Sequence, residues 1–443
     1  MRRAVATVTF ILILFCYSKA QAGIVDEILK LARQHNPSLN YLKHDEKVKK
    51  LLVEELKTKK GLQIELSSYL GKERYQSIYV NSVTKNLKYY VISATKPLYL
   101  PGFEHQVKQQ KIDVDITKVN YESQLSNTNA RVLLALAKGA AAEEKIKVLQ
   151  KLQKLSQETL ELYGELLKHR KIPKLALLQE KEQLLRYEIL ENRERQKLAA
   201  SLKELNSYCG VQFEEIPAAL KDSSASVKSF LKATKELEKV NSNSAILKAS
   251  LEKKKAEEEF NYRKYLRYPK VSLNAYYSYT SSSAISTATR DARVFFSIDI
   301  PIYQGGYVSL ARLEAKEKVL SLEDQKKQEE ENLKLKKAQL EPEIVSLIRE
   351  YQILKSKEAI LQETYRLRKK SFSSRKETLA RVLSAEIDIF ENRLNELNVL
   401  EQLVETYLNF LDAADSAKEG FLKPIKEILL EKEIKFNSDT NNS

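Results

Sequence analysis

Two stretches of the sequence alternate between apolar and polar residues. They cover residues 62–70 and 271–279, and each is followed by a polar segment, at 71–86 and 280–292. A second strand-like segment then follows in each case, at 87–96 and 293–300. A period of two predicts half-buried strands, and about nine to eleven residues are enough for a tilted strand to cross a bilayer. The pattern therefore predicts two antiparallel strand pairs, each with a long loop at one end.

A different period governs the segments that follow the strand pairs. Apolar residues recur in steps of three and four before and after residue 375, interrupted only by Glu358, Arg368 and Glu401. This is coiled-coil spacing. It predicts two helical hairpins, with helices over 104–168 and 173–208 and over 307–371 and 377–411. A helix of 65 residues would extend roughly 100 Å, and Pro342 is expected to kink or locally break the third helix.

The two patterns repeat in the same order at an offset of about 205 residues, and such internal similarity governs the domain organisation. Each copy opens with a charged helix, at 24–60 and 243–267. The predicted organisation is a signal peptide over 1–22, a first repeat over 23–210, a linker over 211–242, a second repeat over 243–418 and a tail over 419–443. We expect one short helix in the tail and disorder over 437–443.

Composition supports long helices and export. Only 10 Gly and 9 Pro punctuate 443 residues. The N-terminus has two arginines, an apolar run and then Ala20-Gln21-Ala22, which predicts a cleavable secretory signal. Cys16 could indicate a lipoprotein, but the bulky Phe15 argues against it. Cys209 is then the one cysteine left, so no disulfide is expected within the mature chain. The net charge of +15 would suit nucleic acid, but export argues against that partner. No later apolar stretch is long enough for a transmembrane helix, so any crossing would have to use β-strands.

No catalytic, metal or cofactor site is predicted. The four histidines are scattered without metal-ligand spacing, and Cys209 has no histidine near it in sequence. Gly305-Gly306 lacks the frame of a phosphate-binding loop. The many carboxylates lie in helical charge runs that normally form a solvated face. The sequence therefore predicts a protein that is not an enzyme.

Both returning strands end in similar segments that contain proline and glycine. The first ends in Pro97-Leu98-Tyr99-Leu100-Pro101-Gly102-Phe103 and the second in Pro301-Ile302-Tyr303-Gln304-Gly305-Gly306-Tyr307. Strand pairing is expected to stop here and a helix to begin. Two strands and a long helical hairpin, repeated twice behind a signal peptide, resemble the TolC family of outer-membrane efflux proteins. The second junction is similar to that family's strand-to-helix junction.

The resemblance implies an α+β membrane protein with long antiparallel helical hairpins that form a coiled-coil α-barrel. Its four strands per protomer would contribute to a twelve-stranded β-barrel of a homotrimer in outer-membrane lipid. It also implies a passive exit duct, extending into the periplasm, of a tripartite efflux or type I secretion system. The implied partners are a periplasmic adaptor and an inner-membrane pump of the RND, ABC or a similar class. The alternative is a non-channel periplasmic or surface coiled-coil adaptor or scaffold.

The hairpin turns depart from the family's pattern. Where the family carries acidic residues at the periplasmic aperture, this sequence has Arg381, Ser384 and Ala176, and where it carries turn glycines this sequence has Arg170 and Arg375. The turns also hold further basic side chains, among them Lys168, Lys171 and Lys376. One hypothesis is a basic aperture that prefers anions or is docked by an acidic adaptor tip. The other is an exposed cluster with no contact to a pore.

The chain has no tryptophan, so an aromatic belt at a membrane interface would have to consist of tyrosine and phenylalanine. Nine such residues flank the predicted strands: Tyr69, Tyr89, Tyr90, Tyr99, Tyr277, Tyr279, Phe295, Phe296 and Tyr303. Packing inside a soluble sheet domain would explain them equally well.

Overall fold

The structure, a computed structural model, describes residues 23–77, 80–220, 224–282, 288–416 and 419–431. The chain divides into two compact units. The helical unit comprises Met1–Tyr41, Tyr121–Ser244 and Glu330–Ser443, and the sheet unit comprises Leu42–Asn120 and Ala245–Glu329. The predicted signal peptide and the predicted disordered end lie outside the described residues. None of the helices in the described ranges combines the length and apolarity needed to cross a membrane.

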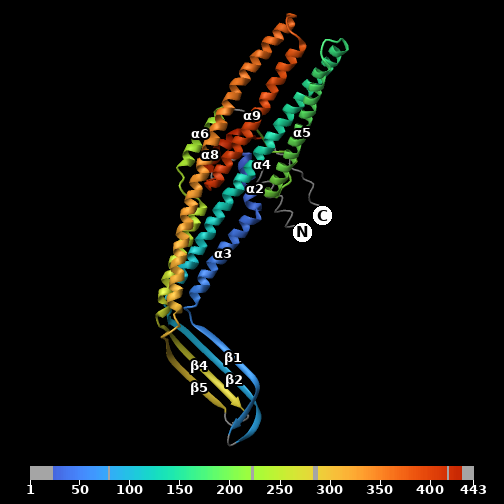
Figure 1. Cartoon of the computed structure of the whole chain (residues 1–443). Helices are drawn as coiled ribbons and strands as arrows, with labels where there is room; N and C mark the ends of the chain where they lie inside the picture. The colour runs from blue at the N-terminus through green and yellow to red at the C-terminus, as the bar shows by residue number, and fades with distance from the viewer. Residues whose placement is uncertain (1–22, 78–79, 221–223, 283–287, 417–418, 432–443) are drawn as a thin grey trace. The chain divides into compact units, whose positions relative to one another are not determined.

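The sheet unit contains one antiparallel sheet of four strands in the order β1-β2-β4-β5 (Figure 1). The strands are β1 (Gln63–Ser77), β2 (Val80–Tyr99), β4 (Lys270–Ser282) and β5 (Thr289–Asp299). Both predicted strand pairs are therefore present, and β2 joins β4 to make them one sheet. The strands are longer than predicted, because β1 and β2 continue through most of the expected loop at 71–86.

Helices of the sheet unit pack through a small apolar cluster and several polar bonds. These helical segments are parts or the whole of α3 (Pro37–Thr58), α4 (Phe103–Lys168), α7 (Ser244–Lys264), the 3₁₀ turn η1 (Tyr265–Arg267) and α8 (Tyr307–Ser373). Val53 of α3 is buried against Phe103 and Val107 of α4. Lys255 of α7 donates to Asp113 of α4 at 2.7 Å.

The helical unit contains the two hairpins except for the first residues of α4 and α8, which belong to the sheet unit. The first joins α4 to α5 (Lys174–Cys209) and the second joins α8 to α9 (Leu379–Ala413). The apolar positions predicted along α9 are buried or packed against the core, as Leu397, Val404 and Leu411 illustrate. The predicted hairpin helices are confirmed, with ends within two residues of those expected.

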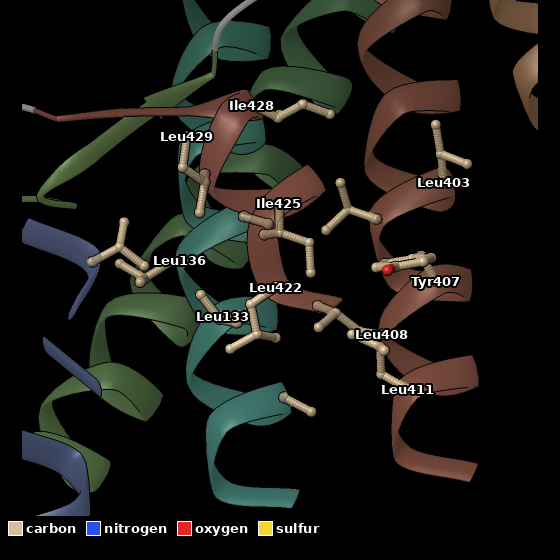
Figure 2. Packing of buried hydrophobic residues seen from close by; sticks show 14 of the residues in the cluster. Leu133, Leu136, Leu403, Tyr407, Leu408, Leu411, Leu422, Ile425, Ile428 and Leu429 are labelled. Carbon is tan, nitrogen blue, oxygen red and sulfur yellow. The ribbon is translucent and has the colours of Figure 1, made fainter. Parts of the chain in front are cut away.

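The main core gathers buried residues of α4, α5, α9 and the tail (Figure 2). Leu133 of α4 lies beside Leu422 of α10 (Glu419–Ile428), and α9 contributes Tyr407 and Leu408 to the same cluster. The hydroxyl of Tyr407 donates to the carbonyl of Phe421 at 2.8 Å. The predicted short tail helix is thus present, and β6 (Leu429–Glu431) follows it.

The segment predicted as a linker has structure of its own. It contains β3 (Ala218–Leu220), which pairs with β6, and α6 (Ser224–Glu238). Phe230 and Leu237 of α6 are fully buried in the main core. Lys337 of α8 donates to the backbone carbonyls of Glu238 and Val240, at the end of α6.

Two further expectations concerned helix continuity, and the first of them was wrong. The predicted helix over 24–60 is two helices, α2 (Ile24–His35) and α3, separated at Asn36. Asn36 has an extended backbone, as a residue before proline prefers, and its side chain accepts a bond from the Ser38 N–H, which caps α3. In α8 the helix continues through Pro342, so a local break is absent there, and the kink that was the other expected outcome stays a prediction.

Candidate functional site

The first hairpin turn is a Schellman motif centred on Arg170. The Lys171 N–H donates to the carbonyl of Leu166 and the Arg170 N–H donates to that of Leu167, both at 2.9 Å. Arg170 has a φ of 56°, in the left-handed region that favours glycine. The structure therefore places Arg170 where the sequence comparison expected a turn glycine.

The second hairpin turn has the same geometry. Lys376 N–H donates to the carbonyl of Ser371 and Arg375 N–H to that of Phe372, again both at 2.9 Å. Arg375 has a φ of 55°. The two repeats thus end their long helices with the same motif and the same Arg-Lys pair. Both turns lie at the same end of the helical unit (Figure 1).

The predicted aperture residues occupy equivalent helix positions. Ala176 is the third residue of α5 after its N-cap Pro173, and Arg381 is the third residue of α9 after its N-cap Thr378. Neither N-cap makes a side-chain capping bond. An acidic residue at this position stabilises a helix N-terminus, whereas alanine is neutral and arginine is unfavourable.

Arg381 is exposed, and a carboxylate lies close to its guanidinium. Its guanidinium lies 3.4 Å from the carboxylate of Glu377, and its backbone carbonyl accepts a bond from Arg368 at 3.0 Å. Ser384, one turn further along α9, is also exposed, and Ala176 is half-buried. The two turns therefore present a mainly basic surface with a single acidic side chain close to Arg381.

The basic side chains predicted at the turns are all exposed. Lys168 pairs with Glu165 at 2.6 Å and thereby holds the pKa of that carboxyl below its ordinary value. Among the described contacts, Arg170, Lys171, Arg375 and Lys376 have no side-chain hydrogen bond or ion pair.

The strand-to-helix junctions depend on glycine at the start of each long helix. Gly102 has a φ of 73° and its carbonyl accepts the N–H groups of His105 and Gln106. A Cβ at Gly102 would lie 2.7 Å from the ring of Tyr262, so a larger residue would force that ring to move. Pairing of β2 with β4 passes Pro97 through a register shift and ends at Tyr99, inside the segment where it was expected to stop. Pro101 and Gly102 form the turn, which the N–H of Phe103 closes by donating to the carbonyl of Leu100.

The second junction follows the same plan with more room. β5 ends at Asp299, before Pro301. Gly305 and Gly306 have φ values of 58° and 83°, and open space surrounds both. The carbonyl of Gly306 accepts the N–H of Leu310, at the start of α8. These glycines are required for backbone conformation alone.

The sheet has one apolar and one polar face. Residues paired across the strands share a face, and the register aligns Ile64, Ala94, Ala275 and Val294 in one row. On this face Ile64, Phe296 and Ile298 are between 61% and 69% exposed. A soluble sheet would bury such a face. The aromatic residues predicted as a belt do not share one face, since Tyr277 and Phe296 lie on the apolar side and Tyr69 and Phe295 on the other.

The polar face carries a hydrogen-bonded group that joins the middle of β4 to the first residues of β5. The hydroxyl of Tyr276 donates to Asp291 at 2.9 Å, and Arg293 lies 2.8 Å from the same carboxylate. The ring of Phe295 meets that of Tyr276 edge to face at 6.3 Å. This face therefore combines polar groups with their partners, as a water-facing surface does.

Two polar contacts between the hairpins were not predicted from the sequence. Lys145 of α4 is fully buried and pairs with Glu401 of α9. Lys138 pairs with Glu405 at 2.7 Å, two turns back along α4 and one turn further along α9. Glu401 interrupts the apolar spacing of α9, and this interruption is the sequence feature that indicates a buried polar contact. Its partner could not be identified without knowing which helix faces α9.

The remaining candidate groups for chemistry have structural surroundings. Nδ1 of His105 lies 2.5 Å from Glu258 in the sheet unit, and the ring of His35 lies against Gly210. Cys209 is fully buried, and burial raises the pKa of its thiol to about 12. Within the described ranges, no cluster of His, Cys, Asp and Glu has the arrangement of a metal site.

Comparisons with known proteins agree with this architecture. Residues 238–414 match the family described as outer membrane efflux protein. No curated protein matches the sequence. The outer membrane protein VceC from Vibrio cholerae has a similar structure, with a TM-score of 0.71 and 13% identity over 88% of this chain and 96% of that one. The Campylobacter jejuni CmeC outer membrane channel has a TM-score of 0.68 and 12% identity over 91% and 88%.

The open state of the Neisseria gonorrhoeae MtrE outer membrane channel is also similar, with a TM-score of 0.66 and 15% identity over 89% of both chains. At these identities the likeness shows a shared fold. The fold predicted from the repeated strand pair and helical hairpin is confirmed.

Proposed function

Residues 238–414 match the family described as outer membrane efflux protein, and from this premise we propose that the chain is a passive exit duct in the outer membrane. The duct would serve a tripartite efflux or type I secretion system. Its expected partners are a periplasmic adaptor and an inner-membrane pump that supplies the energy. The duct itself would carry out no chemical reaction.

The observation that carries this proposal is the sheet with one exposed apolar face. Lipid would cover that face, while the polar face would line water. β1 and β5 are the two edges of the sheet, and each has unpaired backbone groups along its outer side. Four strands cannot close on themselves, so edges of neighbouring copies would have to pair. Three copies would supply the twelve strands that the family resemblance implies.

The helical hairpins support the same assembly. α5 buries Tyr187 and Glu194 on one face and exposes Leu185 and Ile189 on the opposite face. α8 exposes Ile353, Ile360 and Leu367, which are seven residues apart. Spacing of this kind forms seams between helices. Because the two stripes lie on different helices, α5 of one copy would pack on α8 of the next, and such head-to-tail contacts can close a ring.

The turns would form the periplasmic aperture of this duct. Arg381 is the candidate for a residue that favours anions, with Ser384 beside it and Ala176 in the other repeat. Reversal potentials across a planar bilayer test this role. We expect anion preference in the wild type and a shift toward cations in Arg381→Asp. Cation preference in the wild type that Arg381→Asp leaves unchanged would contradict it.

The experiment that tests the function compares two neighbouring substitutions on opposite faces of β5. The wild type should be extracted from outer membranes by detergent as a trimer. Phe296→Asp places a charge on the apolar face, and we expect it to lower the amount of membrane-inserted trimer severalfold. Ser297→Asp places the same charge on the polar face and should leave insertion near the wild-type level.

The competing function is a non-channel coiled-coil scaffold, and the same fractions distinguish it. A soluble monomer in the periplasmic fraction, unaffected by Phe296→Asp, would refute the duct. Single-channel conductance of the purified protein in a planar bilayer gives a second, independent measurement.

A further inference from the structure

The positive charge of this chain is concentrated at the two hairpin turns. Residues 366–381 hold seven lysine and arginine side chains and one glutamate, and residues 165–174 hold four and one. These short segments therefore account for nine of the net fifteen positive charges. Both lie at the same end of the helical unit (Figure 1).

Four of these cations are available to a partner molecule. Nearby acids are already engaged, since Glu165 pairs with Lys168 and Glu363 with Arg366 at 2.8 Å. Glu377 lies beside Arg381. In contrast, the exposed side chains at the centre of each turn have no partner among the described residues. They are Arg170, Lys171, Arg375 and Lys376.

The two arginines occupy positions that disfavour arginine. The left-handed conformation at Arg170 and Arg375 suits glycine or asparagine and strains a residue with an ordinary side chain. Both repeats nevertheless place arginine there, followed by lysine. Strained positions of this kind are found where the side chain has a function. The planar guanidinium can hold a carboxylate through two parallel hydrogen bonds.

We propose that the hairpin turns are a docking surface for a protein partner that presents carboxylates. Arg170 and Arg375 would bind them in bidentate fashion, and Lys171 and Lys376 would add positive charge beside them. Exposed Leu175 and Leu379 give each turn a small apolar contact. This inference rests on the proposed function, because it names the chemistry of the partner that meets the periplasmic end of the duct.

An anionic membrane surface is the competing partner for a basic patch. Membrane-surface binding normally uses a helix that lies flat and presents a broad apolar face. Each turn instead ends a helical hairpin and presents only two exposed apolar residues, Leu175 and Leu178 at the first turn and Phe372 and Leu379 at the second. The geometry therefore favours an acidic protein surface over lipid.

The test uses the full-length protein in detergent and a fluorescent peptide of alternating Glu and Ser, with a Gln-Ser peptide as the uncharged probe. The turn variant combines Arg170→Asn, Lys171→Gln, Arg375→Asn and Lys376→Gln, because asparagine tolerates the left-handed conformation. The control variant removes the same charge from exposed lysines of α8 outside the turns. It combines Lys316→Gln, Lys318→Gln, Lys334→Gln and Lys336→Gln.

We expect the acidic peptide to bind the wild type and the control, and the turn variant to bind it roughly tenfold more weakly with a smaller dependence on salt. Equal losses in both variants, or equal binding of the uncharged peptide, would overturn the proposal. Phosphatidylglycerol vesicles provide the lipid arm. If the turn variant loses vesicle binding and keeps peptide binding, the surface recognises lipid instead.

The same preparations separate this inference from the proposed duct. Trimer mass and single-channel conductance are measured for the wild type and both variants. A turn variant that keeps trimer and conductance but loses the peptide supports both conclusions. A wild type without conductance refutes the duct, whereas a conducting wild type that ignores the acidic peptide refutes only the docking surface.

Discussion

At the scale of single residues, the strand-to-helix junctions distinguish two reasons for a glycine. Gly102 and Gly306 are both left-handed and both start a long helix. Only at Gly102 would a Cβ also meet a neighbouring side chain, the ring of Tyr262. The sequence could predict the left-handed turn from the repeated segments that contain proline and glycine. It could not predict the contact with Tyr262, which depends on how α7 packs.

This difference gives a prediction. Gly306→Ala should cost about 1 kcal/mol of stability from backbone strain alone. Gly102→Ala should cost at least about 2 kcal/mol, because an overpacked contact adds to the strain. Denaturant unfolding followed by circular dichroism measures both. Equal losses for the two variants would show that the Tyr262 contact relaxes without cost.

Cys209 gives a second prediction at this scale. Its thiol is fully buried and its pKa is raised to about 12, so almost no reactive thiolate forms near neutral pH. In a Cys16→Ser background, we expect no reaction with a thiol reagent until the protein is unfolded in guanidinium. Rapid labelling of the native protein would show that the helical unit opens around Cys209.

At the scale of elements, the sequence predicted type better than extent. The extension of β1 beyond Gly71 is polar and does not alternate between apolar and polar residues, so the sequence predicted a loop there. Backbone pairing with β2 does not require apolar side chains, and the ladder therefore continues. For α6 the signal was present, since Val227, Phe230 and Leu237 have helical spacing. The surrounding Ser and Lys residues masked it.

The contact between α4 and α9 supplies a prediction about the buried pair of Lys145 and Glu401. Removing one partner leaves a buried charge without compensation, so Lys145→Met should destabilise the helical unit by about 3 kcal/mol. Glu401→Gln should be less costly, because the amide can still accept a bond from Lys145. The double variant Lys145→Met and Glu401→Met should recover much of the loss. Strictly additive costs in this double-mutant cycle would contradict a coupled pair.

The N-terminus of α9 supplies a prediction at the aperture. Thr378 is the N-cap and Arg381 the third helical residue, so Arg381→Glu creates the Thr-x-x-Glu spacing of a capping box. We expect the variant to be more stable by roughly 0.5–1 kcal/mol, in addition to the change in ion preference expected for an acid. Arg381→Gln serves as the control that removes charge and keeps a capping side chain. A loss of stability in Arg381→Glu would indicate that Arg381 supports the turn.

At the scale of the whole molecule, one chain exposes surfaces that only an assembly can cover. The sequence predicted the alternation of the strands and the spacing of the helices, and both patterns give which residues share a face. Neither pattern predicts which face of the sheet or of a helix stays exposed in one chain. The exposed face depends on which helices pack together within one chain. In the structure, α5 and α8 have exposed apolar stripes opposite their buried faces.

The last prediction concerns these stripes. Ile353 and Ile360 are both 67% exposed in one chain, so Ile353→Ser with Ile360→Ser should hardly change the folding of a single chain. In a closed ring the same residues would be buried between copies, and their loss should make the trimer dissociate at higher protein concentration. The control is Gln352→Ser with Lys357→Ser, on exposed positions of the same helix. Native mass measured over a dilution series decides, since a trimer as resistant to dilution as the wild type would place the contact between copies on another face of α8.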